Sequence, residues 1–367
     1  MVKYSIDNKG AIFYTKIMMT EVLKVNAGNI GMAKVNKAAG IIKEGGLVAF
    51  PTETVYGLGA DALNPKAVVR IFEAKNRPLD DPLIVHITEK KDLFTLAKDI
   101  SDTAHELARE FWPGPLTLVL KKYESIPDIV TAGLDTVAIR MPANEVALSL
   151  IRAAGRPIAA PSANLFGRPS PVTAQQVLED LGGRIDMVID GGKTSIGVES
   201  TVLDLTQEIP TILRPGGISI ERLKEIIKSV RIYKQEGILA PGMYPRHYAP
   251  RAKVVLVEGD EGVQIKNVLK IASSFNKKGY RFGIMAKEEH KKIYGEFFAK
   301  KIGESATLCG GNVKTLGPGD DLTICAANLF SALREFDREG VDFIIAEGVR
   351  EEGIGMAIMD RLRKAAG

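Results

Sequence analysis

The sequence has few cysteines and no long hydrophobic run, and both shortages exclude classes of protein. Cys309 and Cys325 are its only cysteines, which argues against a disulfide framework or a zinc site and fits a reducing compartment. No apolar run approaches about 18 residues, so no transmembrane helix is expected. The segment from Met1 to Lys16 also lacks the apolar core of a secretory signal. We therefore expect a cytoplasmic protein with no membrane contact and no metal site formed by its own side chains.

The sequence also lacks a large excess of charge of one sign. It has 49 basic and 45 acidic residues, a formal net charge of +4, which is too balanced for wholesale coating of nucleic acid but compatible with a local basic groove. With 367 residues, 45% of them hydrophobic, the chain can form two globular domains. We expect an N-terminal extension over 1–20, a first domain over 21–230, a linker rich in glycine and proline over 231–250, and a C-terminal domain over 251–367.

Apolar periodicity predicts a mixture of helices and short strands in the first domain. Helices are expected over 32–44, from 65 to about 75, over 101–111 and from the cap at 173 to 181. Strands are expected over 47–50, 83–87, 116–120, 136–140, 158–160, 187–189 and 200–205. Residues 51–60 are expected to form a loop because glycines interrupt them. In the second half, strands over 254–257, 282–285 and 343–346 alternate with helices from about 262 and over 322–339. This alternation is typical of a small three-layer α/β domain.

Two cations stand one residue apart before a proline, in Lys75-Asn76-Arg77-Pro78. Proline disfavours the helical region for Arg77, so we expect an extended segment. Side chains at i and i+2 of an extended chain share a face. The pair is therefore predicted to bind one anion, such as a polyphosphate. Arg77 would offer a rigid fork of N–H donors and Lys75 a mobile point charge. The alternative is a solvated helix end.

A second polar cluster, Pro161-Ser162-Ala163-Asn164, follows a short apolar strand. Active-site loops of α/β folds commonly lie at such positions. Ser162 has no Gly-x-Ser-x-Gly surroundings, so donation of hydrogen bonds to phosphate is favoured over a nucleophilic role. An ordinary turn is the alternative.

Four segments together resemble the YrdC-like family of threonylcarbamoyl-AMP synthases: residues 50–59, the Lys75/Arg77 pair, residues 112–115 and residues 161–164. The resemblance covers roughly 31–217, and the second half resembles the C-terminal domain of the long two-domain form. It implies a twisted mixed sheet with helices around a basic cavity, plus a smaller Rossmann-like α/β domain. It also implies a nucleotidyltransferase that joins L-threonine, bicarbonate and ATP, the latter with Mg²⁺, into threonylcarbamoyl-AMP and releases pyrophosphate. The product would serve a downstream threonylcarbamoyl-transferase complex that modifies the tRNA adenosine next to the anticodon.

The resemblance assigns residues to this chemistry. The catalytic candidates are Lys75, Arg77, Ser162 and Asn164. The nucleotide-binding candidates are Lys75, Arg77, Thr136, Ser162, Ser170, Arg214 and His247. The threonine-binding candidates are Thr52, Tyr56, His86, Arg140 and Ser200. Arg140 suits a carboxylate on chemical grounds, although a surface ion pair is its alternative. A lone histidine in an apolar strand, such as His86, is otherwise a core residue, and nothing in the spacing distinguishes Glu53 or Glu199 as a base.

The linker from Pro241 to Pro250 is richer in aromatic residues and cations than a plain spacer. It resembles the lid of two-domain members, in which Arg246, His247 and Tyr248 would close the cavity and exclude water. Tyr244-Pro245 stands where the family commonly has Lys-Tyr, so the contacts of the lid stay open.

Two other functions stay open. A module that binds double-stranded RNA or tRNA would use the same basic cavity for a nucleic-acid backbone. A carbamoyl-transfer maturation factor contains a similar domain, but the zinc-finger and acylphosphatase-like regions expected there are missing. The C-terminal domain is equally compatible with nucleotide binding, partner docking or bracing of the lid.

Overall fold

The structure, a computed structural model, describes residues 2–6, 12–16, 19–26, 30–234, 237–304 and 312–367. Within the expected N-terminal extension, β1 (Val2–Ile6) and β2 (Ile12–Lys16) pair as an antiparallel hairpin. Among the described helices, none is long and apolar enough to cross a membrane.

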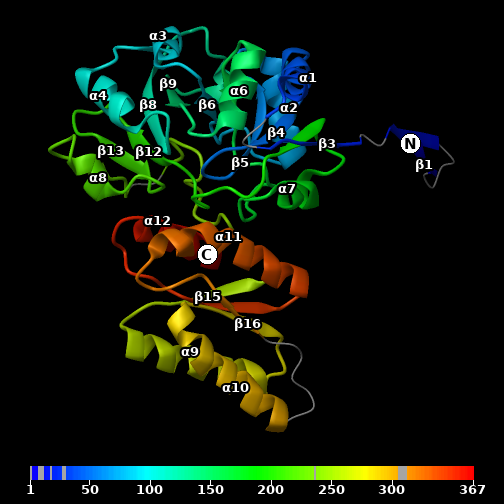
Figure 1. The fold of residues 1–367 in the computed structure, drawn as a ribbon, viewed down its shortest axis with the longest axis vertical. Coiled ribbons are helices and arrows are strands. Elements are labelled where there is room, and N and C mark those ends of the chain that lie inside the picture. Colours follow the sequence, from blue (N-terminus) through cyan, green and yellow to red (C-terminus); the bar gives the residue numbers. More distant parts are fainter. Residues whose placement is uncertain (1, 7–11, 17–18, 27–29, 235–236, 305–311) are drawn as a thin grey trace.

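The first domain is built on a mixed sheet of 12 strands (Figure 1). Across the sheet the order is β14-β13-β12-β8-β9-β6-β10-β5-β4-β11-β3, and β7 pairs with β8. Its strands are β3 (Glu21–Lys24), β4 (Val48–Pro51), β5 (Tyr56–Asp61), β6 (Ile84–His86), β7 (Ala97–Lys98), β8 (Leu116–Lys122), β9 (Thr136–Arg140), β10 (Ile158–Ala159), β11 (Met187–Asp190), β12 (Thr201–Asp204), β13 (Thr211–Arg214) and β14 (Arg231–Ile232). Parallel and antiparallel pairs alternate irregularly along this order, which confirms the predicted mixed sheet.

Helices pack around this sheet, and local signals explain their ends. They are α1 (Met32–Lys43), α2 (Pro65–Lys75), α3 (Leu93–Leu96), α4 (Asp102–Phe111), α5 (Asp128–Thr131), α6 (Glu145–Ala154), α7 (Ala174–Leu181) and α8 (Ile220–Lys224), with a 3-10 turn over Lys90–Asp92. The Asn64 side chain accepts hydrogen bonds from the backbone N–H groups of Lys66 and Ala67, and Ser101 caps α4 in the same way. The predicted helix starts at both positions are confirmed.

The prediction of a loop holds for residues 52–55 but is wrong over 56–60, because β5 is a fully buried strand between β4 and β10. Its glycines serve packing rather than a turn. A Cβ atom on Gly59 would lie 2.7 Å from the Phe50 ring and 2.8 Å from a methyl group of Ile158. Glycine is therefore required here for the close approach of neighbouring strands.

The C-terminal domain has a parallel sheet of four strands in the order β15-β18-β16-β17. Helices α9 and α10 cover its outer face, and α11 and α12 lie between the sheet and the first domain (Figure 1). The elements are β15 (Lys253–Val257), α9 (Glu261–Lys277), β16 (Phe282–Ala286), a 3-10 turn over Glu288–His290, α10 (Lys291–Glu304), β17 (Val313–Thr315), α11 (Leu322–Glu339), β18 (Phe343–Glu347) and α12 (Gly355–Ala366). The predicted three-layer α/β domain is confirmed.

One apolar cluster joins the two domains and the linker. Val55 and Val198 of the first domain pack in it with Tyr248 of the linker and Phe330 of α11. Gly197 allows this close packing, since a Cβ atom there would overlap the carbonyl oxygen of Ala326 and the Cα atom of Ala327 in α11. The C-terminal domain is thus docked directly beneath the strand ends of the first.

Candidate active site

A cavity of about 40 Å³ lies at the ends of several strands of the first domain, beneath the linker. Its walls come from Thr52, Thr54, Val55, Gly57, Arg77, Ile84, His86, Arg140, Ala160, Pro161, Ser162, Glu199, Ser200 and Arg214, and from Pro241, Gly242, His247 and Tyr248 of the linker. Nine of the residues predicted from the sequence are among them: Thr52, Arg77, His86, Arg140, Ser162, Ser200, Arg214, His247 and Tyr248. The sheet therefore brings most of the candidate residues to one place.

Arg140 is fixed at the end of β9 by a buried network. One Nη atom lies 2.7 Å from a carboxylate oxygen of Glu53, and the other donates to the Thr54 hydroxyl at 3.0 Å. Arg140 is only 3% exposed, so the alternative of a surface ion pair is wrong. A guanidinium held this way beside Thr52 suits a small carboxylate ligand.

His86 ends β6 and lines the cavity next to Arg140. Its Nδ1 atom lies 3.2 Å from the carbonyl oxygen of Ile84, which makes Nδ1–H the donor. Burial, and then the charge of Arg140, lower the pKa of His86 to about 3. The ring is consequently neutral near pH 7 and acts as a hydrogen-bonding group rather than a cation.

Arg214, at the end of β13, is a buried cation that contacts neutral oxygens. Its guanidinium donates to the carbonyl oxygens of Ser200 at 2.9 Å and Pro241 at 3.0 Å, and to the Ser200 hydroxyl at 3.2 Å. Among the described residues, no carboxylate lies within ion-pair distance of it. Burial lowers the pKa of Arg214, but guanidinium groups stay protonated in proteins. The cavity wall therefore carries a positive charge that an anion can neutralise.

The Lys75/Arg77 segment differs from the prediction. Lys75 is the last residue of α2, and Asn76 follows in the left-handed region at φ 52°, so the segment is a capped helix end rather than an extended strand. The proline after Arg77 restricts only Arg77 itself, which is why the extended prediction failed for its neighbours. Both cations are buried, so the alternative of a solvated helix end is wrong as well.

The two cations also point to different targets. Lys75 Nζ donates to the carbonyl oxygens of Ser162 and Asn164 at 2.6 Å each, and burial lowers its pKa well below the usual value. It thereby holds the loop over 162–164 from behind. Arg77 lines the cavity and forms an ion pair with Asp81 at 2.9 Å.

The loop over 162–164 contributes one side chain to the cavity. Ser162 lines it, and its backbone pairs with Gly57 of β5. The Asn164 amide instead donates to the carbonyl oxygens of Leu165 and Arg168 at 2.7 and 3.0 Å. Asn164 thus shapes the loop and does not line the cavity in this structure.

Three other candidates lie outside the cavity walls. Thr136 starts β9, opposite Lys121, and lies four residues or about 13 Å along the strand from Arg140. The Tyr56 hydroxyl donates to the carbonyl oxygen of Gly192 at 2.7 Å. The Ser170 hydroxyl donates to the carboxylate of Glu199. None of these three side chains lines the cavity in this structure, and their ligand contacts stay predictions.

The linker covers the cavity with two buried aromatic residues. His247 is 5% exposed and Tyr248 is 1% exposed, and their rings contact each other with centroids 4.0 Å apart. Within the described part of the chain, His247 Nδ1 and the Tyr248 hydroxyl have no hydrogen-bond partner. Burial lowers the pKa of His247 well below its usual value and raises the pKa of Tyr248. Arg246 is exposed and lies outside the cavity lining, so the prediction that it closes the site is not supported by this geometry.

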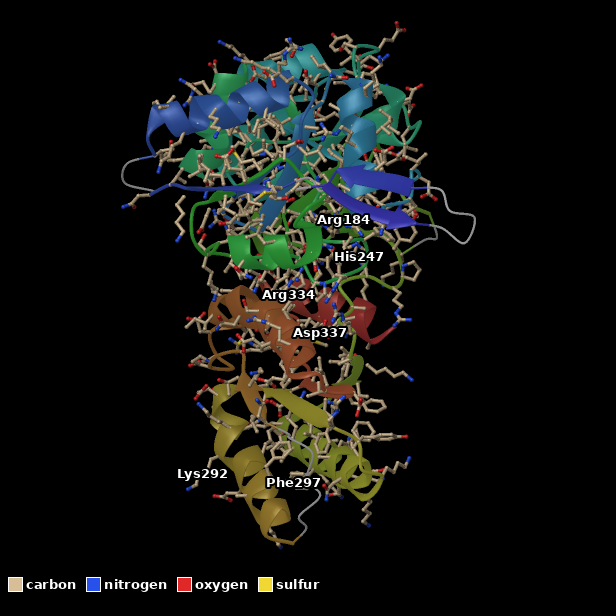
Figure 2. The ribbon with its side chains drawn as sticks, turned by 90° about the vertical axis from the view of Figure 1, so that its right-hand side faces the viewer. Arg184, His247, Lys292, Phe297, Arg334 and Asp337 are labelled. Atoms are coloured by element: carbon tan, nitrogen blue, oxygen red, sulfur yellow. The ribbon has the colours of Figure 1, made fainter. Side chains whose placement is uncertain are left out.

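Three contacts that no motif indicated hold the linker in place. Tyr244, one of the two departures from the family pattern, donates from its hydroxyl to a carboxylate oxygen of Asp80 at 2.5 Å. Lys364 of α12 donates to the carbonyl oxygen of Gly242 at 2.9 Å, and its own carbonyl accepts from His247 N–H at 3.2 Å. Figure 2 shows His247 at the boundary between the domains, with Arg334 and Asp337 on the C-terminal side. Helical periodicity gave no signal for these contacts, because it does not reveal what a helix will dock against.

Three carboxylates in the cavity region form ion pairs with arginines. Glu53 pairs with Arg140, Asp81 with Arg77 and Glu199 with Arg361. In the described ranges, no group of three or more His, Cys, Asp or Glu side chains is arranged to hold a metal ion.

Two family models match the chain. Residues 40–216 match the Sua5/YciO/YrdC family model, described as "Telomere recombination". Residues 218–367 match the model described as "Threonylcarbamoyl-AMP synthase, C-terminal domain". Together they account for both domains.

Curated relatives share most of this length. The threonylcarbamoyl-AMP synthase of Pyrococcus abyssi (strain GE5 / Orsay) is 50% identical over 340 residues, which cover 91% of this chain and 94% of the relative. The synthase of Bacillus subtilis (strain 168) is 45% identical over 340 residues, with 91% and 93% covered. The crystal structure of P. abyssi Sua5 complexed with L-threonine is also similar, with a TM-score of 0.86 and 49% identity over 95% of this chain and 98% of that one. The likeness therefore extends over both domains and their arrangement.

Proposed function

The chain belongs to the family of threonylcarbamoyl-AMP synthases in its two-domain form, and we propose how its cavity binds the substrates. It is a nucleotidyltransferase that synthesises threonylcarbamoyl-AMP for the threonylcarbamoyl modification of tRNA. We propose L-threonine, bicarbonate and ATP as substrates and pyrophosphate as the second product. A cytoplasmic location is proposed because these substrates and tRNA occur together there.

Arg140 and its neighbours are proposed to bind L-threonine. The buried guanidinium of Arg140 would pair with the carboxylate, while Thr52, Ser200 and the neutral His86 ring offer hydrogen bonds to the hydroxyl and the amine. The related P. abyssi protein has been crystallised with L-threonine, which supports this assignment. A neutral His86 matters here, because a protonated ring would repel the ammonium form of the amino acid.

The reaction requires two bond-forming steps. The unprotonated amine of threonine attacks the carbon of bicarbonate, and loss of water leaves a carbamate. A carbamate oxygen then attacks the α-phosphorus of ATP, and the bond to the β-phosphate oxygen breaks to release pyrophosphate. Negative charge accumulates on the phosphates, so stabilisation comes from fixed donors and cations rather than from a covalent nucleophile.

Arg214, Arg77 and Ser162 are proposed to bind the triphosphate. The observation that carries this proposal is the guanidinium of Arg214, which donates to neutral oxygens and lines the same cavity as His247 and Tyr248. Among the described residues, His247 Nδ1 and the Tyr248 hydroxyl have no hydrogen-bond partner. Buried polar groups without partners cost free energy, and a phosphate or ribose group would supply the missing partners. Lys75 is proposed to act indirectly by holding Ser162 in place.

Mg²⁺ is proposed to enter with ATP, bound to phosphate oxygens. The carboxylates near the cavity are paired with arginines, and Mg²⁺ bound through substrate phosphates needs few protein ligands. Bound with ATP, Mg²⁺ would withdraw charge from the phosphates. The residues of this chain would then bind and orient the magnesium–ATP complex.

The linker is proposed to act as a lid. The covered cavity has a volume of about 40 Å³, far less than the roughly 300–1,000 Å³ of typical ligand pockets. ATP therefore cannot enter until His247 and Tyr248 withdraw, and their return would exclude water from a labile carbamate. A duplex RNA backbone is too large for the covered cavity, which disfavours the RNA-binding alternative. We propose that a threonylcarbamoyl-transferase complex takes up the product.

One assay tests the proposed reaction. The purified full chain is incubated with magnesium–ATP, labelled bicarbonate and one amino acid, and pyrophosphate and labelled adenylate are measured. L-Threonine should support both products, serine much less and valine none, while Arg140→Gln should raise the threonine KM by at least tenfold, the worth of about 1.4 kcal/mol. Equal turnover with all three amino acids would refute the threonine pocket. Absence of labelled adenylate with L-threonine would refute the reaction.

A further inference from the structure

Arg361, from the last helix of the C-terminal domain, reaches the wall of the cavity in the first domain. It is completely buried, and its Nε atom lies 2.8 Å from a carboxylate oxygen of Glu199, a cavity-lining residue. Its Nη2 atom donates to the carbonyl oxygen of Pro215 at 3.0 Å. Its guanidinium carbon lies 4.9 Å from the centroid of the Tyr248 ring in the lid. One side chain of the C-terminal domain thus contacts both the wall and the lid.

We propose that Arg361 is a positioning residue for formation of the adenylate: it compensates the charge of Glu199 and supports the closed position of Tyr248. This inference rests on the proposed function of the cavity. It also assigns a role to the C-terminal domain beyond stabilising the fold, because this domain contributes the Arg361 side chain that supports the cavity wall and the lid.

The first part of the argument concerns charge. Burial alone would raise the pKa of Glu199, but Arg361 and then Arg214 hold it below the usual value, so the cavity wall includes a carboxylate. An uncompensated carboxylate would repel the triphosphate and compete for Arg214. Because Arg361 pairs with Glu199 from the far side, Arg214 stays available for phosphate.

The second part concerns the lid. Tyr248 has a left-handed backbone conformation at φ 60°, which residues other than glycine rarely adopt without support. Its ring lies between two groups of the C-terminal domain, since Phe330 stacks on it with centroids 5.6 Å apart and Arg361 lies over it. A cation over an aromatic face is attractive, and more so when both are desolvated. The contact therefore stabilises the lid in the position that covers the cavity.

Lys364, also on α12, contacts the linker through the carbonyl oxygen of Gly242, but its carboxylate partner is Asp360 of the same helix. The other ion pairs at the domain boundary lack a connection to the cavity. Arg334 pairs with Asp180 at 2.7 Å and Arg168 with Asp337 at 2.9 Å, and none of these four residues lines the cavity. Figure 2 shows Arg334 and Asp337 on the helix below His247. Among the ion pairs described between the domains, the pair of Arg361 with Glu199 is the one that includes a residue of the cavity lining.

The test compares Arg361→Met and Arg361→Lys with Arg363→Met. Arg363 lies on the same helix but is exposed and pairs with Glu258 and Glu351 inside the C-terminal domain, which makes it a matched control. We expect Arg361→Met to lower kcat/KM for ATP by at least tenfold, since a cavity carboxylate loses its partner. Arg361→Lys should lose less because it keeps the charge, and Arg363→Met should stay within about twofold of the unaltered chain. Equal effects of Arg361→Met and Arg363→Met would overturn the proposal.

A pH profile separates positioning from a general loss of structure. The ionisable groups facing Glu199 are Arg361 and Asp360 from α12, Arg214 from β13 and Tyr248 from the linker. Without Arg361, burial should raise the pKa of Glu199. Acidification should then protonate Glu199 and remove its repulsion of the triphosphate, so the pH profile of Arg361→Met should shift towards higher relative activity at low pH. Glu199→Gln combined with Arg361→Met removes the unpaired charge, and should abolish this shift and recover part of the activity. Purely additive losses with unchanged pH profiles would contradict the charge argument. If Arg361→Met alone does not fold, a double variant that recovers no activity would contradict it as well.

Limited proteolysis measures the opening of the linker independently of the reaction. Arg246 is exposed in the linker, so trypsin cleavage after Arg246 reports how often the linker leaves the cavity. Cleavage should be several-fold faster in Arg361→Met than in Arg363→Met, and ATP should slow it in the unaltered chain. Unchanged cleavage would overturn the role in the lid. If the unaltered chain formed no adenylate, the proposed function would fail, whereas the cleavage result would still stand.

Discussion

Buried cations at the domain boundary differ from those around the cavity in what neutralises them. At the boundary, Arg334 has its own carboxylate partner in Asp180. At the cavity, Arg214 donates to carbonyl and hydroxyl oxygens instead. A cation paired with a carboxylate attracts a further anion less strongly than a cation on neutral oxygens does. We therefore expect the cations on neutral oxygens to contribute most to the binding of phosphate.

Arg77 and Arg140 are intermediate, because both line the cavity and each pairs with a carboxylate, Arg77 with Asp81 and Arg140 with Glu53. Burial raises the pKa of Asp81 above its usual value, and the charge of Arg77 offsets part of that rise. A double substitution can therefore separate the structural role of the pair from its role in binding phosphate.

The largest effect is expected for Arg77→Gln. It should lower turnover by about a hundredfold or more, as loss of a key electrostatic contact does, and destabilise the fold by about 3–5 kcal/mol because Asp81 stays buried and unpaired. Arg77→Gln with Asp81→Asn should regain most of the stability without regaining activity. Thermal unfolding and steady-state kinetics of both variants measure the two effects. Recovery of activity in the double variant would mean that Arg77 serves only Asp81.

Arg334→Gln should affect stability more than chemistry. It leaves Asp180 buried beside Arg168 at 3.5 Å, so we expect a loss of about 3 kcal/mol in the free energy of unfolding. Arg338, exposed on the same helix, gives the control variant Arg338→Gln, which should be nearly neutral. Chemical denaturation of both variants measures this, and equal unfolding midpoints would show that the boundary ion pair contributes nothing.

Gly197→Ala should loosen the docking of the domains. The added Cβ atom meets backbone atoms of α11, and overpacking of this kind costs about 1–3 kcal/mol. Gly133→Ala is the matched control, because Gly133 also has φ near 80° but no atom within 4 Å of the added Cβ. Gly197→Ala should therefore raise the ATP KM and hasten cleavage in the linker, while Gly133→Ala should show only the cost of backbone strain. Identical behaviour of the two variants would argue against tight docking.

The smallest effect concerns His86 and pH. The ring takes up a proton near pH 6.5 in the unfolded chain, whereas in the fold burial and Arg140 lower its pKa to about 3. The unfolded state binds more protons between these values, so stability should fall as pH falls from about 6.5, by up to about 1.4 kcal/mol per pH unit from this group. His86→Asn should show a weaker loss of stability between pH 6.5 and 4.5. Parallel curves for the two proteins would mean that His86 is not held neutral.

The helices with local signals could be predicted from the sequence, and the packing of charged residues could not. Asn64 and Ser101 mark helix starts because a cap is a contact between residues two or three apart. Gly57 and Gly59 misled the prediction of a loop, since the same residue type serves turns and close strand packing. The helix over Lys291–Glu304 was missed because lysines surround its buried Tyr294 and Phe298.

The sequence could predict which residues belong to the candidate site, but not how they are arranged in it. Motifs identified Arg77, Arg140 and Ser162, which the fold brings to one cavity. The distinct role of Lys75 depends on a left-handed Asn76, and the contact of Arg361 depends on how two domains dock. Neither feature leaves a pattern in the local sequence.

The affinity for ATP in Arg214→Gln, compared with Arg334→Gln, tests most directly whether cations on neutral oxygens bind phosphate. Titration calorimetry with magnesium–ATP on both full chains gives the two dissociation constants. Arg214→Gln should weaken ATP binding by at least about tenfold, or 1.4 kcal/mol, while Arg334→Gln should stay within about threefold of the unaltered chain despite its lower stability. Unchanged ATP affinity in Arg214→Gln, or a larger loss in Arg334→Gln, would contradict this assignment.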